Sequence, residues 1–413
     1  MRDNWKELVI GNELNFLGGF PFSSSKFNEQ GDGIPLIRIR DLLNSSQETY
    51  YSGEYSNSYL IKEGDVLVGM DGDFHLVRWK NSPSLLNQRI LKISEKKSSE
   101  IDIDFLFYYL KPFLLDVHNK TAATTVKHLS TFDVSRAVDL FPPLPQQKKI
   151  AQILSTVDEV IEQTESAIAK YQAIKQGLMH DLFTRGIDIN TGKLRPSPQD
   201  APQLYKESAL GLIPREWEVE ELGVLTSKVV DGTHFTPTYT ENGVPFLRVT
   251  DVQTNKIDFE KIKYVSKVEH NELIKRCHPE RGDILYSKNG TIGIPKLVDW
   301  DWEFSIFVSL ALIKPKKEII QSEYLLQLLP EEIIWKQIRQ RAKQGTVTNL
   351  HLEEIREFLI PLPNKIEQQA ICKRGMIIKN KIQTEQQALG KYQQLKSGLM
   401  QDLLTGRVGV VVD

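Results

Sequence analysis

The sequence is poor in the features that mark secreted, membrane and metal-binding proteins. It has only two cysteines, Cys277 and Cys372, which lie far apart and give neither a disulfide framework nor a metal-ligand spacing. No apolar run is long enough to span a bilayer, and the first residues lack the basic-then-apolar layout of a signal peptide. The eight histidines are scattered. We therefore expect a reduced, cytoplasmic protein without a metal site.

The chain also lacks an excess of charge of either sign. It carries 52 Lys and Arg residues against 54 Asp and Glu residues, for a formal net charge of −2. Proteins that coat nucleic acid indiscriminately are driven by neutralising phosphates, so this class is disfavoured. A specific reader with local basic loops stays open, as does one whose partners supply the positive charge.

No catalytic motif is recognisable. The glycine at Gly186 and the Gly192-Lys193 pair enclose five residues instead of the four of a phosphate loop. Phe141-Pro142-Pro143 has the wrong first residue for the motif that holds the target amine in amino-methyltransferases. Glu95-Lys96-Lys97 is at most half of a nuclease site, and no nucleophile–base arrangement is readable. The sequence therefore favours a binding or assembly role.

The strongest feature that is present is a repeat. Lys170–Thr184 reads KYQAIKQGLMHDLFT and Lys391–Thr405 reads KYQQLKSGLMQDLLT, with ten of fifteen positions identical at an offset of 221. GIPLIRIRDL also matches GVPFLRVTDV, EGDVL matches RGDIL, and TVKHL matches TVTNL. A Pro-Leu-Pro recurs at an offset of 218, so we expect three extra residues near 364–366. These matches indicate an internal duplication.

The duplication predicts the order domain, helix, domain, helix. Short β-prone runs between turn residues indicate a mixed α+β fold for each domain. A helical piece near 104–117 should start or kink its second half at Pro112. The expected segments are domain 1 (1–142), a spacer helix (143–186), a linker with a hairpin at 190–192 (187–210), domain 2 (211–360), a second spacer helix (361–407) and a tail (408–413).

Both spacer helices carry an apolar repeat of about 3.5 residues, the pattern of a coiled-coil seam. Gly375 interrupts the second helix and should cost about 1 kcal/mol relative to Ala. Because each helix follows an equivalent domain, we expect an antiparallel coiled coil with pseudo-twofold symmetry. The expected seam residues are Ile150, Leu154, Val157, Ile161, Ile168, Tyr171, Ile174, Leu178, Ile371, Ile378, Ile382, Leu389, Tyr392, Leu395 and Leu399.

Polar loops in both halves carry residue types suited to DNA. Lys, Arg and small hydroxyls hold phosphates, while Arg or Lys can read guanine and Asn or Gln can read adenine. Each residue could equally be a solvated loop residue, so the loops are candidates as a set. They comprise Thr233, His234, Thr236, Arg248, Lys288, Asn289, Thr291, Arg339, Arg341, Lys343, Gln344 and Thr346 in the second half, and Arg38, Arg40, Asp71, His75, Arg78, Thr124, Thr125, Lys127 and His128 in the first.

Together these motifs resemble the specificity subunits of type I restriction–modification systems. The likeness rests on QQKKIAQIL and the fifteen-residue repeat in the helices. In the second half it rests on DGTHFTP, GVPFLRVTD, RGDILYSKNGTIG and GTVTNLHLEEIREFLIPLP. The first domain keeps GIPLIRIRDL and EGDVL but has Met70-Asp71-Gly72-Asp73 where the second has Lys288-Asn289-Gly290-Thr291. Such divergence is expected if each domain reads a different half-site.

The resemblance implies a non-catalytic subunit with two target-recognition domains, each reading one half of a bipartite double-stranded DNA target. The helix pair, roughly 50 Å long at ~1.5 Å per residue, would set the gap. Two methyltransferase subunits with S-adenosylmethionine would dock on the helices, and restriction subunits would join. S-adenosylmethionine, ATP and Mg²⁺ would all be bound by these partners and none by this chain. A non-catalytic coiled-coil adaptor or regulatory DNA-binding protein is the alternative.

Overall fold

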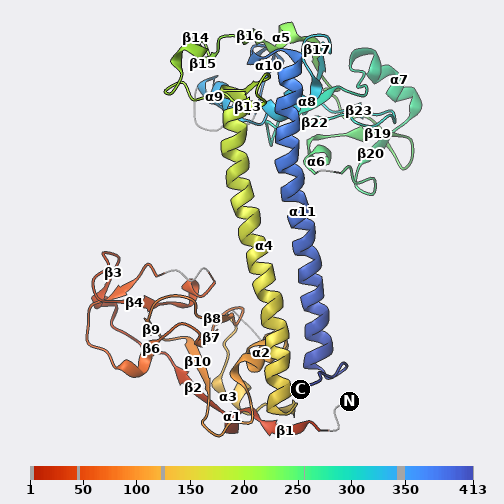
Figure 1. The fold of residues 1–413 in the computed structure, drawn as a ribbon. Coiled ribbons are helices and arrows are strands. Elements are labelled where there is room, and N and C mark those ends of the chain that lie inside the picture. Colours follow the sequence, from red (N-terminus) through yellow and green to blue (C-terminus); the bar gives the residue numbers. More distant parts are fainter. Residues whose placement is uncertain (1–3, 44–46, 122–125, 255, 342–348, 413) are drawn as a thin grey trace. The chain divides into compact units, whose positions relative to one another are not determined.

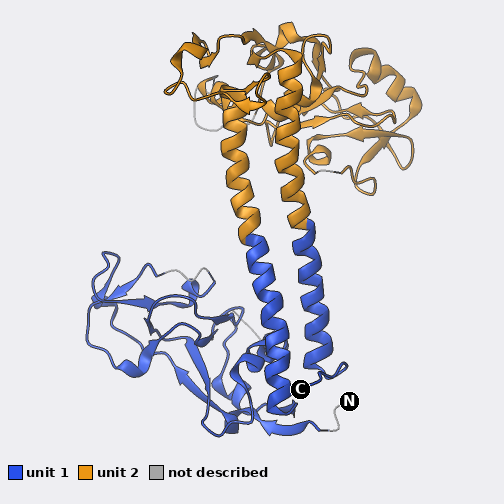
Figure 2. Ribbon diagram, in the orientation of Figure 1, with its two compact units in different colours: residues 1–165, 387–413 blue, residues 166–386 orange. Residues whose placement is uncertain are grey.

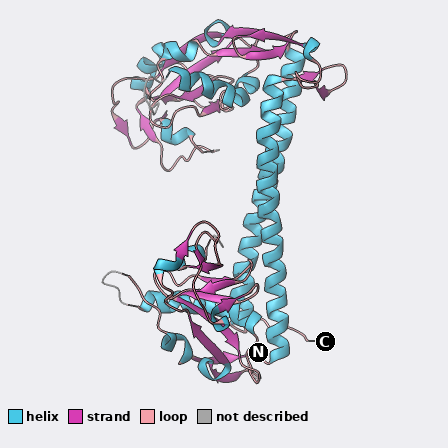
Figure 3. Cartoon of the chain, turned by 90° about the vertical axis from the view of Figure 1, so that its left-hand side faces the viewer, coloured by secondary structure: helices cyan, strands magenta, loops and turns pink. Residues whose placement is uncertain are grey.

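The computed structural model describes residues 4–43, 47–121, 126–254, 256–341 and 349–412. The chain divides into two compact units, residues 1–165 with 387–413 and residues 166–386. Figure 2 shows that each unit contains a globular domain together with one part of each long helix. Figure 3 shows the mixed helix and sheet content expected for the domains.

The first domain is built on two sheets. One is antiparallel, in the order β2-β10-β7-β8, and the other has the order β3-β5-β4-β9-β6 with β4 and β9 parallel. All four residues of β7 are buried, as suits a central strand rich in valine. The strands are β1 Lys6–Val9, β2 Leu14–Gly18, β3 Phe27–Asn28, β4 Ile34–Ile37, β5 Tyr50–Tyr51, β6 Leu60–Ile61, β7 Val66–Gly69, β8 Leu76–Arg78, β9 Ser84–Leu86, β10 Ile90–Glu95 and β11 Val138–Phe141.

The first domain also contains three helices, α1 Ile10–Glu13, α2 Ile103–Lys120 and α3 Thr131–Ser135. The Asp102 side chain caps α2 by accepting hydrogen bonds from the backbone nitrogens of Asp104 and Phe105. Pro112 lies inside α2, so it does not start a separate helix there. Strands β1 and β11 pair with each other beside these helices and bring the two ends of the domain together.

The second domain repeats this plan. Its antiparallel sheet has the order β17-β24-β21-β22, and its second sheet has the order β18-β20-β19-β23 with β19 and β23 parallel. Strands β16 and β25 pair as β1 and β11 do. The strands are β16 Glu218–Glu221, β17 Thr226–Asp231, β18 Tyr239–Thr240, β19 Val244–Leu247, β20 Lys263–Val265, β21 Ile284–Ser287, β22 Pro295–Leu297, β23 Ser305–Ile306, β24 Leu310–Pro315 and β25 Leu359–Leu362.

The helices of the second domain show where the two copies differ. They are α5 Leu222–Leu225, α6 Val249–Val252, α7 Lys267–Arg276, α8 Ser322–Leu328, α9 Glu332–Arg341 and α10 Leu352–Arg356. Helices α8 and α9 stand where the first domain has the single helix α2. Helix α7 stands where the first domain has only a 3-10 turn at Asn57–Tyr59. The frameworks are therefore the same, while the segments between strands have diverged.

Two long helices follow the domains in the sequence, α4 after the first domain and α11 after the second (Figure 1). Their bounds are Leu144–Thr184 for α4 and Lys365–Leu404 for α11. In one unit Lys396 of α11 forms an ion pair with Asp158 of α4. In the other unit the Lys381 ammonium lies 5.5 Å from the centre of the Tyr171 ring. Higher numbers in one helix thus oppose lower numbers in the other, and the helices are antiparallel.

The expected insertion of three residues in the second copy is wrong. Strand β11 ends at Phe141 and β25 ends at Leu362, and α4 begins at Leu144 and α11 at Lys365, so both pairs have an offset of 221. The Pro-Leu-Pro at 143–145 opens a helix, whereas the one at 361–363 closes a strand. Proline is tolerated both in the first turn of a helix and at a strand end, so the two motifs match in letters but not in structure.

A buried glutamine fastens the start of each long helix to its domain. The Gln147 amide accepts a hydrogen bond from the backbone nitrogen of Asp102 and donates to the carbonyls of Glu100 and Pro142. Gln368 makes the same three bonds, to Gln321 N, Ile319 O and Pro363 O. Both side chains are fully buried, and the acceptor–donor pattern is identical. The duplication therefore extends to individual hydrogen bonds.

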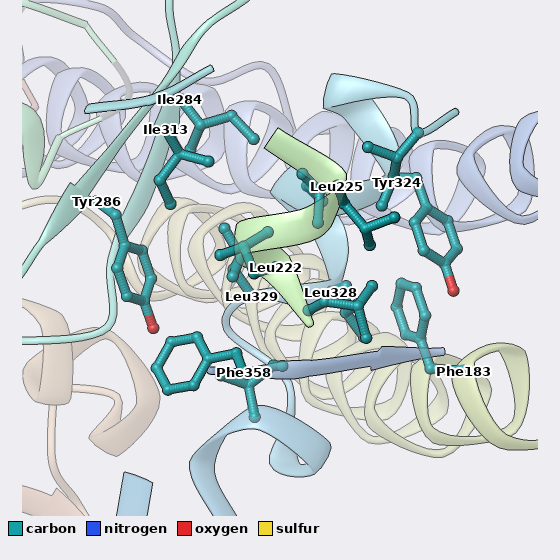
Figure 4. Close-up of a cluster of buried hydrophobic side chains, with 14 of the residues drawn as sticks. Phe183, Leu222, Leu225, Ile284, Tyr286, Ile313, Tyr324, Leu328, Leu329 and Phe358 are labelled. Atoms are coloured by element: carbon teal, nitrogen blue, oxygen red, sulfur yellow. The ribbon is translucent and has the colours of Figure 1, made fainter. Parts of the chain in front are cut away.

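The last turns of each long helix complete the core of a domain. Met179, Leu182 and Phe183 at the end of α4 belong to the core of the second domain. Figure 4 shows Phe183 next to Tyr324 in this core. The Phe183 and Tyr324 rings meet edge to face, with centroids 5.3 Å apart. Leu403 at the end of α11 belongs to the core of the first domain, together with Ile150 of α4. The first copy of the fifteen-residue repeat, at the end of α4, thus packs into the second domain. The second copy, at the end of α11, packs into the first domain.

The residues expected in the seam are buried to different degrees. Ile174 and Leu395 are exposed at 45% and 51%, so they lie outside the buried face. The physical reason is that a straight helix has 3.6 residues per turn, so a stripe extrapolated at 3.5 drifts off the contact face. Ile150, Leu154, Ile168, Ile371 and Ile382 are buried, and Val157, Ile161, Tyr171, Leu178, Ile378, Leu389, Tyr392 and Leu399 are partly buried.

Gly375 is needed for close packing. A Cβ atom there would lie 2.0 Å from Gln327 Oε1 and 3.3 Å from Met179 Sδ. The absence of a side chain therefore lets α11 approach both α8 and α4, which offsets its low helix propensity. Gly375 therefore does not interrupt α11. It is a position of close packing within one continuous helix.

The segment after α4 is clamped onto the start of α11. Gly186 ends α4 in a left-handed conformation with φ of +65°. The Glu367 carboxylate, fully buried, accepts a hydrogen bond from Ile187 N at 2.8 Å and pairs with the Arg195 guanidinium at 2.5 and 3.1 Å. The expected hairpin is present as β12 Ile187–Asp188 with β13 Lys193–Leu194, and a second one follows as β14 Tyr205–Ser208 with β15 Gly211–Pro214.

The tail after α11 has no regular structure in its described residues, 408–412. Val410 packs against the core of the first domain, whereas Val411 is exposed. Across the described part of the chain, no helix combines the length and the apolar character needed to cross a membrane.

We predict that Gln368→Leu destabilises the second domain strongly. Leucine has a similar size but leaves Gln321 N, Ile319 O and Pro363 O without their partner, at a cost of about 3 kcal/mol for buried groups. The free energy of unfolding in urea measures the effect. Gln369→Leu, at the exposed neighbouring position, is the matched control. Equal stability of the two variants would contradict the role given to Gln368.

Candidate nucleic-acid interface

In each domain, four segments meet at the same end of the antiparallel sheet. They are the loop after the first strand, the hairpin loop between β7 and β8 or between β21 and β22, the turn before β10 or β24, and the segment that leads into the last short helix. In the second domain they are joined by backbone bonds from Val308 N to Thr233 O, Lys288 N to Ser309 O and Leu350 N to Lys288 O. In the first domain the same bonds run from Gln88 N to Phe20 O, Met70 N to Arg89 O and Leu129 N to Met70 O. We call this the loop junction.

The loop junction of the second domain holds a cluster of charges around Asp231. This side chain is only 4% exposed. Its carboxylate lies 2.5 Å from Arg276 Nη2, 3.1 Å from His234 Nε2 and 3.4 Å from Lys288 Nζ. Arg276 and Lys288 supply the counter-charges that a buried carboxylate requires because its desolvation is costly. Arg276 and His234 are more than half exposed, so they carry this cluster to the surface.

The first domain has a different cluster at its loop junction. Asp71 lies 2.7 Å from His128 Nδ1 and 3.7 Å from Arg89 Nε. Arg89 has φ of +70°, a left-handed conformation that is rare outside glycine and is often found at functional sites. The two clusters thus use different loops and different residues on the same backbone framework.

The second-domain candidates fall into exposed and internal groups. His234, Thr236 and Thr291 are exposed on the loops, whereas Thr233 is buried and its hydroxyl bonds with the backbone of Phe235. Asn289 is partly buried, and its Oδ1 has no hydrogen-bond partner among the described residues.

Lys288 is a candidate DNA contact from the sequence, but its side chain is only 7% exposed and its ammonium faces Asp231. The structure gives it an internal partner, because the buried carboxylate requires a counter-charge. Arg339 is exposed on α9 and pairs with Glu332 of the same helix. The side chain of Arg341 and the residues Lys343, Gln344 and Thr346 lie outside the described part of the chain.

The arginines of the GIPLIRIRD and GVPFLRVTD motifs have structural partners. Asp251 accepts hydrogen bonds from the backbone nitrogen and the guanidinium of Arg248 at 2.8 and 3.1 Å. Asp41 likewise accepts from Arg38 N at 2.8 Å, and Arg40 lies 3.6 Å from its carboxylate. These motifs therefore cap a short helical turn in both domains. The same turn adjoins the junction, since Val249 N donates to Ser309 Oγ at 3.2 Å.

Two of the remaining first-domain candidates bond elsewhere. Arg78 pairs with Asp104 of α2 at 2.7 Å, and Lys127 donates to the carbonyl of His118 at 2.5 Å. His75 is partly buried in the hairpin loop and accepts a backbone hydrogen bond from Gly69 N. Thr124 and Thr125 lie outside the described residues. Asp71 and His128 are thus the candidates that the structure brings together.

The sequence did not point to three participants in these clusters. Asp231 lies within a noted loop, but its burial was not foreseen. Arg276 ends α7, a helix without a counterpart in the first domain, and Arg89 follows β9 in a segment without a motif. No spacing pattern links these residues, since 45 positions separate Arg276 from Asp231. Only folding brings them together.

A cavity of about 250 Å³ adjoins the Asp231 cluster. It is lined by Thr233, His234, Leu273, Arg276, Cys277 and Ile306, among others. Burial raises the pKa of the Cys277 thiol to about 12, so this thiol stays protonated and is no nucleophile at neutral pH. Within the described ranges, no three His, Cys, Asp or Glu side chains are grouped so that they could hold a metal ion.

Two equivalent domains with differently charged loop junctions, each followed in the sequence by one of two paired helices, define a duplicated binding protein. A family model described as the type I restriction modification DNA specificity domain matches residues 2–171 and 214–393. The chain belongs to this family.

Named relatives cover nearly the whole chain. The type I restriction enzyme EcoBI specificity subunit of Escherichia coli is 30% identical over 379 residues, 91% of this chain and 79% of that protein. The MjaVIII specificity subunit of Methanocaldococcus jannaschii is 25% identical over 431 residues, 99% of this chain and 94% of that protein. The crystal structure of the S subunit of a type I restriction–modification system from M. genitalium has the same fold, with a TM-score of 0.61, 17% identity and coverage of 97% and 96% of the two chains.

Proposed function

We propose that this chain is the DNA-recognition subunit of a type I restriction–modification complex, and that each domain reads one half of a bipartite target. The observation that carries the proposal is the pair of loop junctions. The same backbone bonds join the loops that carry Asp231 and His234 in one domain and Asp71, Arg89 and His128 in the other, and Arg276 reaches Asp231 from α7. Different donors on one framework suit two different DNA sequences, because base edges are told apart by their hydrogen-bond patterns.

The paired helices suit the role of a spacer. Helix α4 has 41 residues and α11 has 40. At ~1.5 Å per residue each is about 60 Å long, which exceeds the ~34 Å of one duplex turn. A helix pair is stiff, so it would fix the number of base pairs between the half-sites rather than merely limit it.

Repeated exposed residues on the helices suit two identical partners. Ile174 and Leu395 occupy the same place in the two repeat copies, and both are exposed. Gly177 and Gly398 follow three residues later, and a Cβ atom at either would meet nothing within 4 Å. An exposed apolar side chain beside a glycine is a suitable contact site for a partner helix, because the glycine leaves space next to it. We place one methyltransferase subunit at each.

The catalytic steps are assigned to the partners. In this proposal the methyltransferase subunits bind S-adenosylmethionine, restriction subunits bind ATP and Mg²⁺, and this chain binds no cofactor. The near-neutral net charge of −2 suits a subunit whose partners share the phosphate contacts. The complex would act in the cytoplasm, where the host DNA lies.

The spacer role predicts the effect of lengthening both helices. Four residues, about one turn, are inserted after Ala167 and after its repeat counterpart Ala388, which keeps the helices paired. We expect the recognised gap to grow by about two base pairs, since the insertion adds ~6 Å, while both half-sites stay the same. Mapping of methylated sites in cells measures both quantities. The same insertion in the tail after the exposed Val411 should change nothing, and altered half-sites with an unchanged gap would refute the spacer role.

The docking role predicts a stepwise loss of partners. A complex of the wild-type chain should contain two methyltransferase subunits, that of Ile174→Asp or Leu395→Asp only one, and that of the double variant none. Native mass spectrometry counts the subunits directly. Val268→Asp, at a 77% exposed position outside the helix pair, serves as the control. Two subunits on the double variant would rule out these docking positions.

A further inference from the structure

Asp231 is the centre of the charge cluster in the second domain, and its partners come from three separate elements. Arg276 is the last residue of α7, His234 lies in the loop after β17, and Lys288 opens the loop after β21. Arg276 Nη2 also lies 3.4 Å from His234 Nε2. One carboxylate thus holds two exposed donor groups next to each other and uses the buried Lys288 as a further counter-charge.

The framework of the loop junction does not need this carboxylate. The first domain has Gly18 at the position of Asp231 and Met70 at the position of Lys288, as the strand registers and loop bonds show. The four segments of its loop junction are nevertheless joined by the same backbone hydrogen bonds. Asp231 and its partners are therefore an addition to the second domain rather than a requirement of the fold.

The cluster changes both the geometry and the charge at the surface. Free arginine and histidine side chains sample many rotamers, and an ion pair with a buried, immobile carboxylate restricts them to one arrangement. The carboxylate also cancels one positive charge close to where DNA would approach. Attraction to phosphate is thereby weakened, while the unpaired N–H groups of the guanidinium stay available as directed donors.

We propose that Asp231 is a positioning residue for sequence readout by the second domain. It orients the Arg276 guanidinium, with His234 beside it, toward an acceptor-bearing base edge, such as N7 and O6 of guanine, and suppresses the non-specific attraction of this guanidinium to phosphate. This inference rests on the proposed function, since it assigns a role within DNA recognition. It makes Asp231 act through its partners, without touching DNA itself.

The test uses Asp231→Asn in the full chain, assembled with its methyltransferase subunits. Asparagine keeps the shape but removes the charge that holds the two donors. Binding is measured on the intact target, on a duplex with the first half-site scrambled and on one with the second scrambled, each over a range of salt concentrations. Asp258→Asn is the matched control, because it removes an equally negative charge from the same domain at an exposed ion pair with Lys261.

For Asp231→Asn we expect about a tenfold loss of discrimination at one half-site only, the one read by the second domain. Affinity for the duplex with that half-site scrambled should rise, and the slope of log K against log salt should steepen by about one unit, because a positive charge is freed to bind phosphate. Discrimination at the other half-site should not change. A merely structural role would instead lower affinity for all three duplexes together.

Arg276→Gln provides a second variant, in which the buried Asp231 carboxylate keeps Lys288 and His234 as partners. It should lose the same discrimination, but with a shallower salt slope, since it removes a cation. If both variants discriminate as the wild type does, or if Asp231→Asn weakens binding to every duplex alike, the inference is refuted. If the wild-type complex itself shows no half-site preference, the proposed function fails and the inference fails with it.

Discussion

The structure depends on where the last turns of the two long helices are buried. Met179, Leu182 and Phe183 of α4 pack in the core of the second domain, and Leu403 of α11 packs in the core of the first. Each domain therefore needs the end of the helix that starts from the other domain. At about 1.5–3 kcal/mol for each large apolar side chain buried, neither domain core is complete without its borrowed turns. The last turns of the two helices are thus parts of the domains.

This exchange explains why the repeat is the most similar part of the two halves. Its inward residues fill two equivalent cores, and its outward residues Ile174 and Leu395 present equivalent surfaces. The loop junctions are under no such constraint, because backbone bonds hold them. Charged side chains can then differ between domains, as Asp231 with Arg276 differs from Asp71 with Arg89. Because the backbone holds the loops and the side chains are free to differ, one framework can bind two different DNA sequences.

The sequence predicted the elements that depend on local patterns. The duplication, the two long helices, their antiparallel pairing and the hairpin near Gly192 all follow from spacing and turn residues, and the structure shows them. The Pro-Leu-Pro alignment failed because proline fits two unrelated positions. Ile174 and Leu395 were misplaced because a heptad pattern drifts along a straight helix. The charge clusters could not be predicted from the sequence, because Arg276 and Asp231 are brought together only by the tertiary fold. Nothing in the sequence distinguishes Lys288 from a surface lysine.

The central claim is that two unequal domains on one helix pair read two unequal halves of a DNA target. The most direct measurement is a genome-wide map of methylated adenines in cells that express the methyltransferase subunit with and without this chain. The account predicts methylation that depends on the chain and falls at a split motif, with two different half-sites separated by a constant gap. Methylation at a single continuous motif, at half-sites with a variable gap, or at the same positions without the chain would contradict it.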